Sequence, residues 1–126
     1  TGKLGSASCC SNSSSPVDVV GLASGVAAVS ANTHTCVVIT QGGLKCWGAN
    51  RSGQLGDGTV SVRITPVGVA GLTSGANAVS VGFFYTCALT TAVSVKCWGT
   101  NSSGQLGDGT STERLTPTDV VGLTTE

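Results

Sequence analysis

The sequence predicts an all-β fold built from tandem units, and three observations lead to this prediction. A 15-residue stretch, KCWGANRSGQLGDGT at residues 45–59, returns 51 residues later as KCWGTNSSGQLGDGT, with 13 identical positions. Within each unit, short runs rich in β-branched residues are separated by Gly, Ser and Asn, as is typical of strands joined by turns. No segment combines a helical period with a helix start and stop signal. The chain is therefore expected to consist of repeated antiparallel strands.

The repeat divides the chain into four parts. The Gly-Lys-Leu-Gly of residues 2–5 aligns with the Gly-Gln-Leu-Gly of residues 53–56, so the chain begins with the end of a unit and continues into a polar loop with two cysteines. Both termini fall inside repeats, as we expect for a piece of a longer array. The four parts are residues 1–15, the first full unit at 16–65, the second at 66–116 and the start of a third at 117–126.

Four strands are expected in each unit. In the first unit they cover residues 26–31, 35–40, 44–48 and 64–69. The Gln-Gly-Gly of residues 41–43 supplies the turn of a hairpin between the second and third strands. Thr-Ala-Val-Ser at residues 91–94 occupies the same place in the second unit and is a weaker turn signal.

The hairpin brings cysteines together. Folding the second strand back on the third places Cys36 opposite Cys46, and facing residues of an antiparallel pair have α-carbons about 4.5 to 5.5 Å apart. That distance suits a disulfide, and Cys87 and Cys97 repeat the arrangement. Each bond would close a loop of about ten residues and add roughly 2.5 to 3 kcal/mol of stability. Two such disulfides predict an extracellular or cell-surface location, since reducing compartments keep thiols open.

Cys9 and Cys10 are adjacent, unrepeated and left over once both hairpins are closed. Neighbouring side chains of an extended segment point in opposite directions, so two separate bonds are easier than one mutual bond. Our hypothesis is that they form intermolecular disulfides, or bonds to other parts of a longer chain. A strained vicinal disulfide and free thiols remain the alternatives.

Composition narrows the function classes. Charged residues make up 10% of the chain and the net charge is zero, so no basic patch indicates nucleic acid. The apolar runs are far shorter than the roughly 20 residues of a membrane-spanning segment. Three Asn-x-Ser sequons are predicted glycosylation sites and are compatible with an extracellular location. They lie at Asn12, Asn50 and Asn101.

The signature Trp-Gly-x-Asn-x-Ser-Gly-Gln-Leu-Gly-x-Gly resembles the regulator of chromosome condensation repeat. The resemblance implies a β-propeller blade of four antiparallel strands. It leaves function open, because such propellers serve as nucleotide-exchange factors, light sensors, ubiquitin-ligase accessory modules and β-lactamase inhibitors. The paired cysteines look more like those of secreted bacterial variants than like the nuclear members.

The repeated signature residues are interpreted as scaffold rather than as an active site, because the same set recurs in both units. The glycines allow close backbone approaches, the tryptophans and leucines pack between units, and the Asn and Gln amides bond loop backbone. The set comprises Trp47, Gly48, Asn50, Gln54, Leu55 and Gly56, and in the second unit Trp98, Gly99, Asn101, Gln105, Leu106 and Gly107.

Candidates for chemistry are weak. Asp57 and Asp108 occupy equivalent points of successive units, so they are read as turn residues rather than as a metal or acid-base pair. His34 is the single histidine and does not by itself indicate a catalytic triad. We therefore predict no catalytic residues, no metal site and no cofactor.

The two units differ most where one residue is inserted before the second strand of the second unit. There Phe83, Phe84 and Tyr85 hold three of the five aromatic residues of the chain. They are interpreted as core filler or as a contact patch, since clustered loop aromatics are typical binding anchors.

Two units cannot close a ring, and an open pair leaves bare strand edges. Protein partners are therefore predicted, either copies of the chain or neighbouring blades of a longer array, with a filament as the product if head-to-tail contacts do not close. The leading hypothesis is a non-catalytic, extracellular binding or structural module that contacts neither nucleic acid nor the membrane interior. A propeller-type inhibitor of a secreted enzyme is the alternative, and a guanine-nucleotide exchange factor is less favoured because disulfides do not suit the cytosol.

Overall fold

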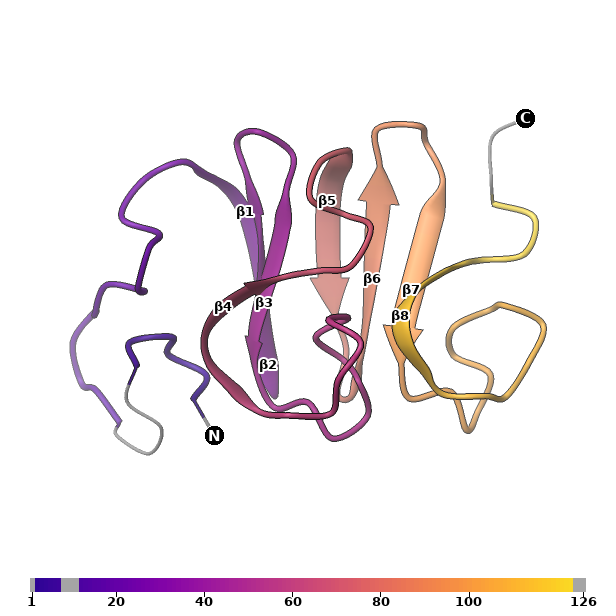
Figure 1. Cartoon of the computed structure of the whole chain (residues 1–126), viewed down its shortest axis with the longest axis horizontal. Coiled ribbons are helices and arrows are strands. Elements are labelled where there is room, and N and C mark those ends of the chain that lie inside the picture. Colours follow the sequence, from indigo (N-terminus) through magenta and orange to yellow (C-terminus); the bar gives the residue numbers. More distant parts are fainter. Residues whose placement is uncertain (1, 8–11, 124–126) are drawn as a thin grey trace.

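A computed structural model describes residues 2–7 and 12–123 of the chain. These residues form two four-stranded antiparallel sheets and contain no helix, so the all-β prediction is confirmed (Figure 1). The first sheet consists of β1 (Val26–Ala31), β2 (His34–Ile39), β3 (Leu44–Gly48) and β4 (Arg63–Gly68), and the second of β5 (Ala76–Val81), β6 (Tyr85–Thr90), β7 (Val95–Gly99) and β8 (Arg114–Asp119).

Both sheets have the same topology, in which strands that follow one another in sequence are neighbours in the sheet. The predicted strands 35–40 and 64–69 each begin one residue earlier, because His34 pairs with Gly48 and Arg63 also pairs with Gly48. The period boundaries at residues 66 and 117 fall inside β4 and β8. Each sheet is therefore completed by residues of the following sequence period.

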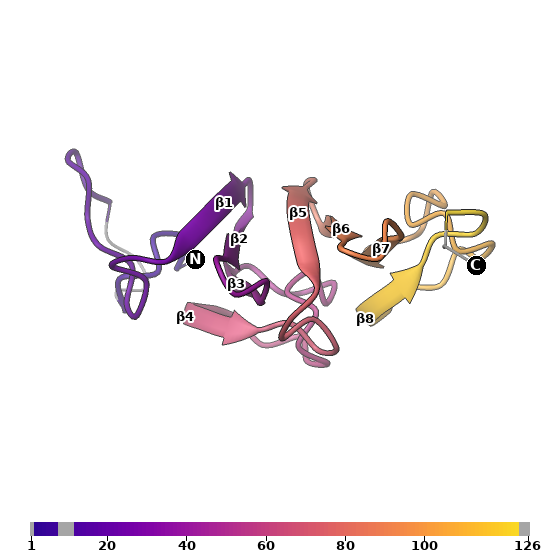
Figure 2. The ribbon, with the colours of Figure 1, turned by 90° about the horizontal axis from the view of Figure 1, so that it is seen from above.

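The core of the molecule lies between the two sheets. They stand side by side with the same orientation, so that β1 and β5 lie at one edge and β4 and β8 at the other (Figure 2). The buried cluster combines residues of both sheets and of the connecting segments. It contains Cys36, Val38, Leu44 and Cys46 from the first sheet, Ala76, Ala88 and Trp98 from the second, and Leu55, Val69 and Leu72 from the connections.

Alternation along the strands decides which side chains enter this core. In β2, Cys36 and Val38 face the second sheet, whereas Thr35 and Val37 lie on the opposite side. In β6, Ala88 faces the first sheet, and the alternating Cys87 and Leu89 face away from it. Each sheet consequently has one face in the core and one outward face.

Candidate protein-binding surfaces

The sheets are joined by a loop of the first unit that binds the tryptophan of the second. The carbonyl oxygen of Gln54 accepts hydrogen bonds from Trp98 Nε1 at 2.9 Å and from Thr86 Oγ1 at 2.7 Å. The loop approaches closely because residue 53 is glycine with φ of 72°, and any side chain there would overlap Leu115 of β8. Gln54 itself is fully buried.

The same arrangement recurs at the start of the chain. The carbonyl oxygen of Lys3, which aligns with Gln54, accepts hydrogen bonds from Trp47 Nε1 at 2.8 Å and from Thr35 Oγ1 at 3.2 Å. The third copy of the loop differs, since a side chain added at Gly104 would meet nothing within 4 Å. Gln105, which is half-buried where Gln54 is buried, therefore belongs to the outward side of the second sheet.

The buried side chain of Asn50 holds its loop together through hydrogen bonds to the loop backbone. Its Nδ2 donates to the carbonyl oxygens of Thr59 at 3.0 Å and Ser61 at 2.9 Å, and its Oδ1 accepts from the backbone N–H of Leu55 at 2.9 Å. Asn101 makes the equivalent bonds, and the two side chains are 0% and 1% exposed.

This burial corrects the sequence-based expectation of glycans at Asn50 and Asn101. The amide nitrogen that would carry the sugar is enclosed and bonded to backbone in both units. Asn12 is exposed and stays a predicted glycosylation site.

The two aspartates of the signature are turn residues. Asp57 binds Arg63 at 3.0 Å and Asp108 binds Arg114 at 2.8 Å. Burial raises the pKa of Asp57, but hydrogen bonds from Thr59, Arg63 and Asn50 outweigh it, so that the pKa lies below its usual range. Hydrogen bonds from Thr110 and Arg114 hold the pKa of Asp108 well below its usual range. Each carboxylate is thus held ionised within its own turn.

His34 bridges the two sheets. Its Nε2 lies 2.6 Å from Thr86 Oγ1, whose hydrogen goes to Gln54 O, so the imidazole N–H donates to the threonine. Its Nδ1 lies 3.3 Å from Thr33 Oγ1. Burial lowers the pKa of His34 to about 4. With a threonine hydroxyl as the acceptor of its N–H, His34 has the surroundings of a structural residue rather than of a catalytic base.

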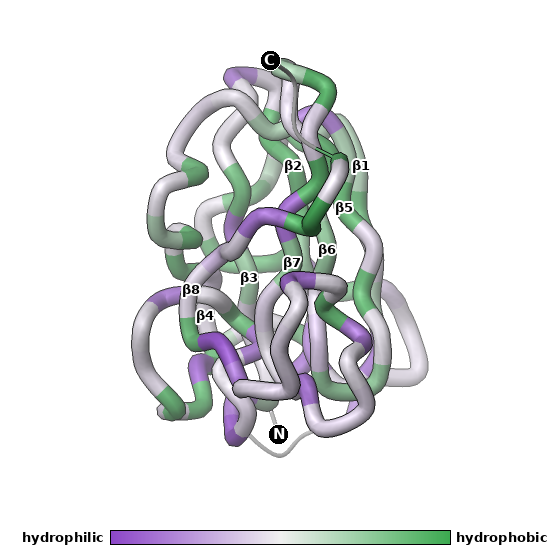
Figure 3. The backbone as a smooth tube through the Cα atoms, turned by 90° about the vertical axis from the view of Figure 1, so that its right-hand side faces the viewer, coloured by the Kyte–Doolittle hydropathy of each residue, from purple (hydrophilic) through white to green (hydrophobic). Residues whose placement is uncertain are grey.

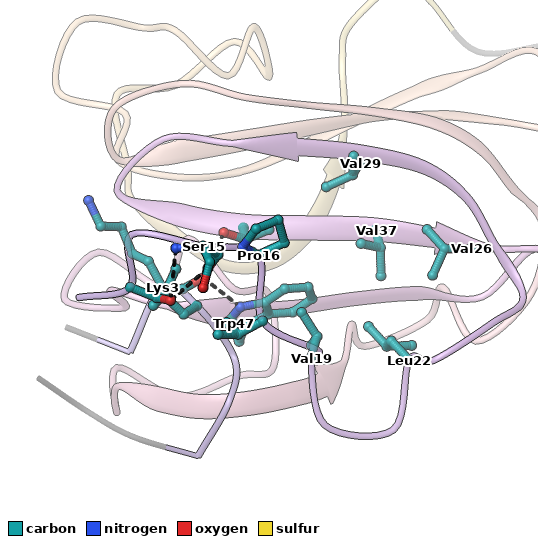
Figure 4. Close-up of a pocket in the computed structure, with 13 residues that line it drawn as sticks. Lys3, Ser15, Pro16, Val19, Leu22, Val26, Val29, Val37 and Trp47 are labelled. Carbon is teal, nitrogen blue, oxygen red and sulfur yellow. Dashed lines mark hydrogen bonds between the residues drawn. The ribbon is translucent and has the colours of Figure 1, made fainter. Parts of the chain in front are cut away.

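The outward face of the first sheet is an apolar groove. Val29 and Val37 of the sheet and Leu22 of the N-terminal segment face one another across it, with Val26 and the Trp47 ring at its ends (Figure 4). The hollow has a volume of about 390 Å³. Val29 is 65% exposed, which is unusual for a valine in the middle of a strand.

The outward face of the second sheet is also apolar. The residues that line its hollow of about 200 Å³ include Ala78, Ser80, Cys87, Leu89 and Val95. Figure 3 looks at this side of the molecule and shows apolar stretches along β5 and β6. In the first sheet, the equivalent positions hold Ala28, Ser30, Cys36, Val38 and Leu44. Those side chains of the first sheet meet the second sheet.

The two hairpin cysteine pairs are bonded and differ in accessibility. Cys36 and Cys46, with α-carbons 4.1 Å apart, are both fully buried between the sheets. Cys87 and Cys97 have the same α-carbon distance, but Cys87 is half-buried at the outward face. Cys9 and Cys10 lie outside the described residues.

The three aromatic residues at the insertion do not form one cluster. Phe83 and Phe84 are 64% and 46% exposed, with ring centroids 5.5 Å apart. Tyr85 is half-buried, and its ring lies against Gly82, where a side chain would collide with it. The exposed pair is thus separate from Tyr85, which belongs to the outward sheet face.

Sequence reasoning did not identify the valine groove, although the alternation of Val29 with Ser30 and of Val37 with Cys36 contained a signal for it.

Among residues 2–7 and 12–123, no group of three or more His, Cys, Asp or Glu side chains could hold a metal ion. Within the same part of the chain, no helix is long and apolar enough to cross a membrane.

Comparison with known proteins places these sheets in a family. The model of the regulator of chromosome condensation (RCC1) repeat matches residues 41–89 and 94–126, and a second model of the same repeat matches residues 77–105. The human protein RCC2 is 36% identical over 83 residues, which cover 65% of this chain and 16% of RCC2. The ultraviolet-B receptor UVR8 of Arabidopsis thaliana is 34% identical over 94 residues, covering 74% of this chain and 21% of the receptor. The chain thus spans about a fifth of these relatives or less.

Solved structures show the same architecture. Human WBSCR16 superposes with a TM-score of 0.75 and 17% identity, over 94% of this chain and 33% of that protein. Prp20p of Saccharomyces cerevisiae, described with its binding to Gsp1p and histones, superposes with a TM-score of 0.67 and 15% identity, over 75% of this chain and 25% of its own. The two sheets are therefore propeller blades, and the chain belongs to the regulator of chromosome condensation (RCC1) repeat family.

Proposed function

We propose that the chain is a non-catalytic binding and structural module that joins further blades, either copies of itself or neighbouring blades of a longer array. One observation carries this proposal: the two outward faces have the residue types of the two halves of the interface between the sheets. The groove presents Val29, Val37 and Trp47 where the second sheet presents Val79, Ala88 and Trp98. The second sheet's outward face presents Cys87 and Leu89 where the first presents Cys36 and Val38.

Apolar burial supplies the driving force for such association. A sheet face in contact with water gains roughly 25 cal/mol for each Å² of apolar surface that a partner covers. The net charge of zero leaves little repulsion between copies. We further propose that the module works in an oxidising location, outside the cell or at its surface, because each unit has a disulfide. Cys9 and Cys10 are proposed to cross-link chains there.

The test is the mass of the native protein by light scattering over a range of concentrations, with and without reductant, together with electron micrographs. We expect species heavier than the 12.3 kDa chain, either as closed particles or as filaments. Loss of the heavy species on reduction would assign the cross-links to Cys9 and Cys10 if the Cys9→Ser, Cys10→Ser variant behaves in the same way. A mass of 12.3 kDa at every concentration would overturn self-association.

A second candidate is an inhibitor of a secreted enzyme, favoured by the exposed Phe83 and Phe84 on one loop. Two exposed aromatic rings, tilted by 57° to one another on a turn, are typical of an anchor that fills a pocket. Stoichiometric inhibition of a secreted hydrolase, lost in Phe83→Ser with Phe84→Ser but not in Val29→Asp, would support it. A guanine-nucleotide exchange factor is less favoured, because the disulfides do not suit the reducing cytosol.

A further inference from the structure

The side chains of the two outward faces differ in size from those of the interface inside the chain, and the differences on the two faces compensate one another. Inside the chain, His34 reaches Thr86 across an interface lined by Ala76 and Ala88. At the outward faces the equivalent positions hold Tyr85 on one side, with Val26 and Val37 on the other. Two valines in place of alanines hold a docked sheet farther away, and tyrosine reaches farther than histidine.

We propose that the outward face of the second sheet docks into the groove of a second copy, with Tyr85 taking the place that His34 has inside the chain. This inference rests on the proposed function and specifies its partner and register. The tyrosine hydroxyl then meets Thr35 Oγ1 of the second copy, which already donates to Lys3 O as Thr86 donates to Gln54 O.

The position of Tyr85 supports this role. It follows the alternation of Cys87 and Leu89, so its side chain belongs to the outward face. Its ring lies on Gly82. Gly82 aligns with Asn32 of the first unit, because the backbone N–H of each donates to the carbonyl of the first residue of the next strand, Tyr85 and His34 respectively. A side chain at residue 82 would collide with that ring. Glycine at residue 82 therefore leaves room for the Tyr85 ring in the orientation that docking requires.

A second polar contact fixes the register. Inside the chain, Ser30 Oγ accepts a hydrogen bond of 3.1 Å from the backbone N–H of Val81. Ser80 occupies the place of Ser30 on the outward face, and Ala31 occupies the place of Val81 beside the groove. Ser80 of one copy is therefore placed to accept from Ala31 N–H of the next, as the valines and Leu89 come into contact.

Contacts of this kind are heterologous, because the groove and the docking face are different surfaces. The test uses the full chain in two blocked forms, each carrying Cys9→Ser and Cys10→Ser. Val29→Asp blocks the groove, and Val95→Asp blocks the docking face. We expect each blocked chain alone to be monomeric and the mixture to form a one-to-one dimer that does not grow, by sedimentation equilibrium.

Register is tested by cross-linking in the same background. A chain with Ser80→Cys and a chain with Ala31→Cys should form a disulfide-linked dimer only when mixed. Ser30→Cys with Val81→Cys in one chain is the positive control, since those residues are in contact within the chain. Ser111→Cys mixed with Ala31→Cys is the negative control, because Ser111 is an exposed loop residue.

Tyr85→Phe removes the proposed hydroxyl contact and should weaken the dimer about three- to tenfold, as expected for one neutral hydrogen bond. Thr35→Val should have the same effect, and the two changes together should weaken the dimer no more than either alone. Gly82→Ala should weaken it at least as much, by displacing the ring.

The outcomes separate the two proposals. If the unblocked chain associates but the blocked chains are unaffected, or if Ser80→Cys chains cross-link to themselves, the docking inference is wrong and the proposed function stands. If the unblocked chain is monomeric throughout, the docking inference and self-association are both overturned, and only the proposed binding to neighbouring blades of a longer array stands.

Discussion

His34 is a neutral histidine between two blades, and this position makes it sensitive to acid. It donates to Thr86 and is fully buried. Burial lowers its pKa to about 4, so the folded state resists a proton that the unfolded chain accepts near pH 6.5. Stability from this residue is therefore complete above pH 6.5 and is lost as the pH falls toward 4.

The expected loss between pH 6.5 and 4 is about 3 kcal/mol, because each unit of pKa difference corresponds to about 1.4 kcal/mol. His34→Gln keeps a donor for Thr86 but does not titrate, and it should flatten the profile in this range. The measurement is the free energy of unfolding in urea at half-unit pH steps. Equal slopes for the two proteins would contradict the assignment. Asp57 and Asp108, whose pKa values are lowered, lose their contributions mainly at lower pH.

Val93 has a backbone conformation that suits glycine. Its φ is 61°, and its counterpart in the first hairpin is Gly42, with φ of 86°. A β-branched side chain in this region is strained by about 1 to 2 kcal/mol. Since Val93 is 72% exposed, Val93→Gly removes little contact and should stabilise the protein by roughly 1 kcal/mol in urea unfolding. Gly42→Val is the matched control and should destabilise it.

At the scale of strands and hairpins, local pattern was sufficient for prediction. The strands follow from β-branched runs between turn residues, and the pairing of Cys36 with Cys46 follows from the length of one hairpin. The outward faces were not predicted, because the side of β2 that meets the next sheet depends on how the sheets stack. The burial of Asn50 and Asn101 was not predicted either, because a three-residue glycosylation motif contains no information on burial.

The two disulfides should behave differently toward reductant. Cys36–Cys46 is enclosed between the sheets, whereas Cys87 is half-buried at the outward face. Under mild reductant, alkylation and mass mapping should find Cys87 and Cys97 labelled first. Docking of a second copy should slow this labelling. Simultaneous labelling of both pairs would show that the sheets separate before either bond is reduced.

Trp98 is the largest side chain in the core between the sheets. Trp98→Ala should cost about 3 to 5 kcal/mol of unfolding free energy, because it leaves a cavity and removes the bond to Gln54 O. Trp47→Ala is expected to have an effect of the same order, since Trp47 repeats the bond at Lys3. Wild-type stability in either variant, measured by urea unfolding, would contradict this account of the packing.

At the scale of the whole molecule, the two open faces should make association apolar in character. Charged residues are 10% of the chain, and Lys3 is the one charged residue among the described residues that line the two hollows. Raising NaCl from about 0.05 to about 0.5 M should therefore change the association constant by less than about threefold, since screening acts on charges. Cooling should weaken association, as hydrophobic contacts lose strength on cooling. Sedimentation equilibrium measures both, and a steep salt dependence would indicate a different interface.

In the first two Gly-x-Leu-Gly loops, a backbone carbonyl accepts a hydrogen bond from the tryptophan of the sheet that follows in sequence: Lys3 O from Trp47 and Gln54 O from Trp98. A ribosome makes the chain from the N-terminus, so each acceptor loop exists before the tryptophan that needs it has been synthesised. Every new blade can therefore fold against a surface that is already complete. The order of synthesis and the direction of packing coincide, and the blades need not wait for the end of the chain.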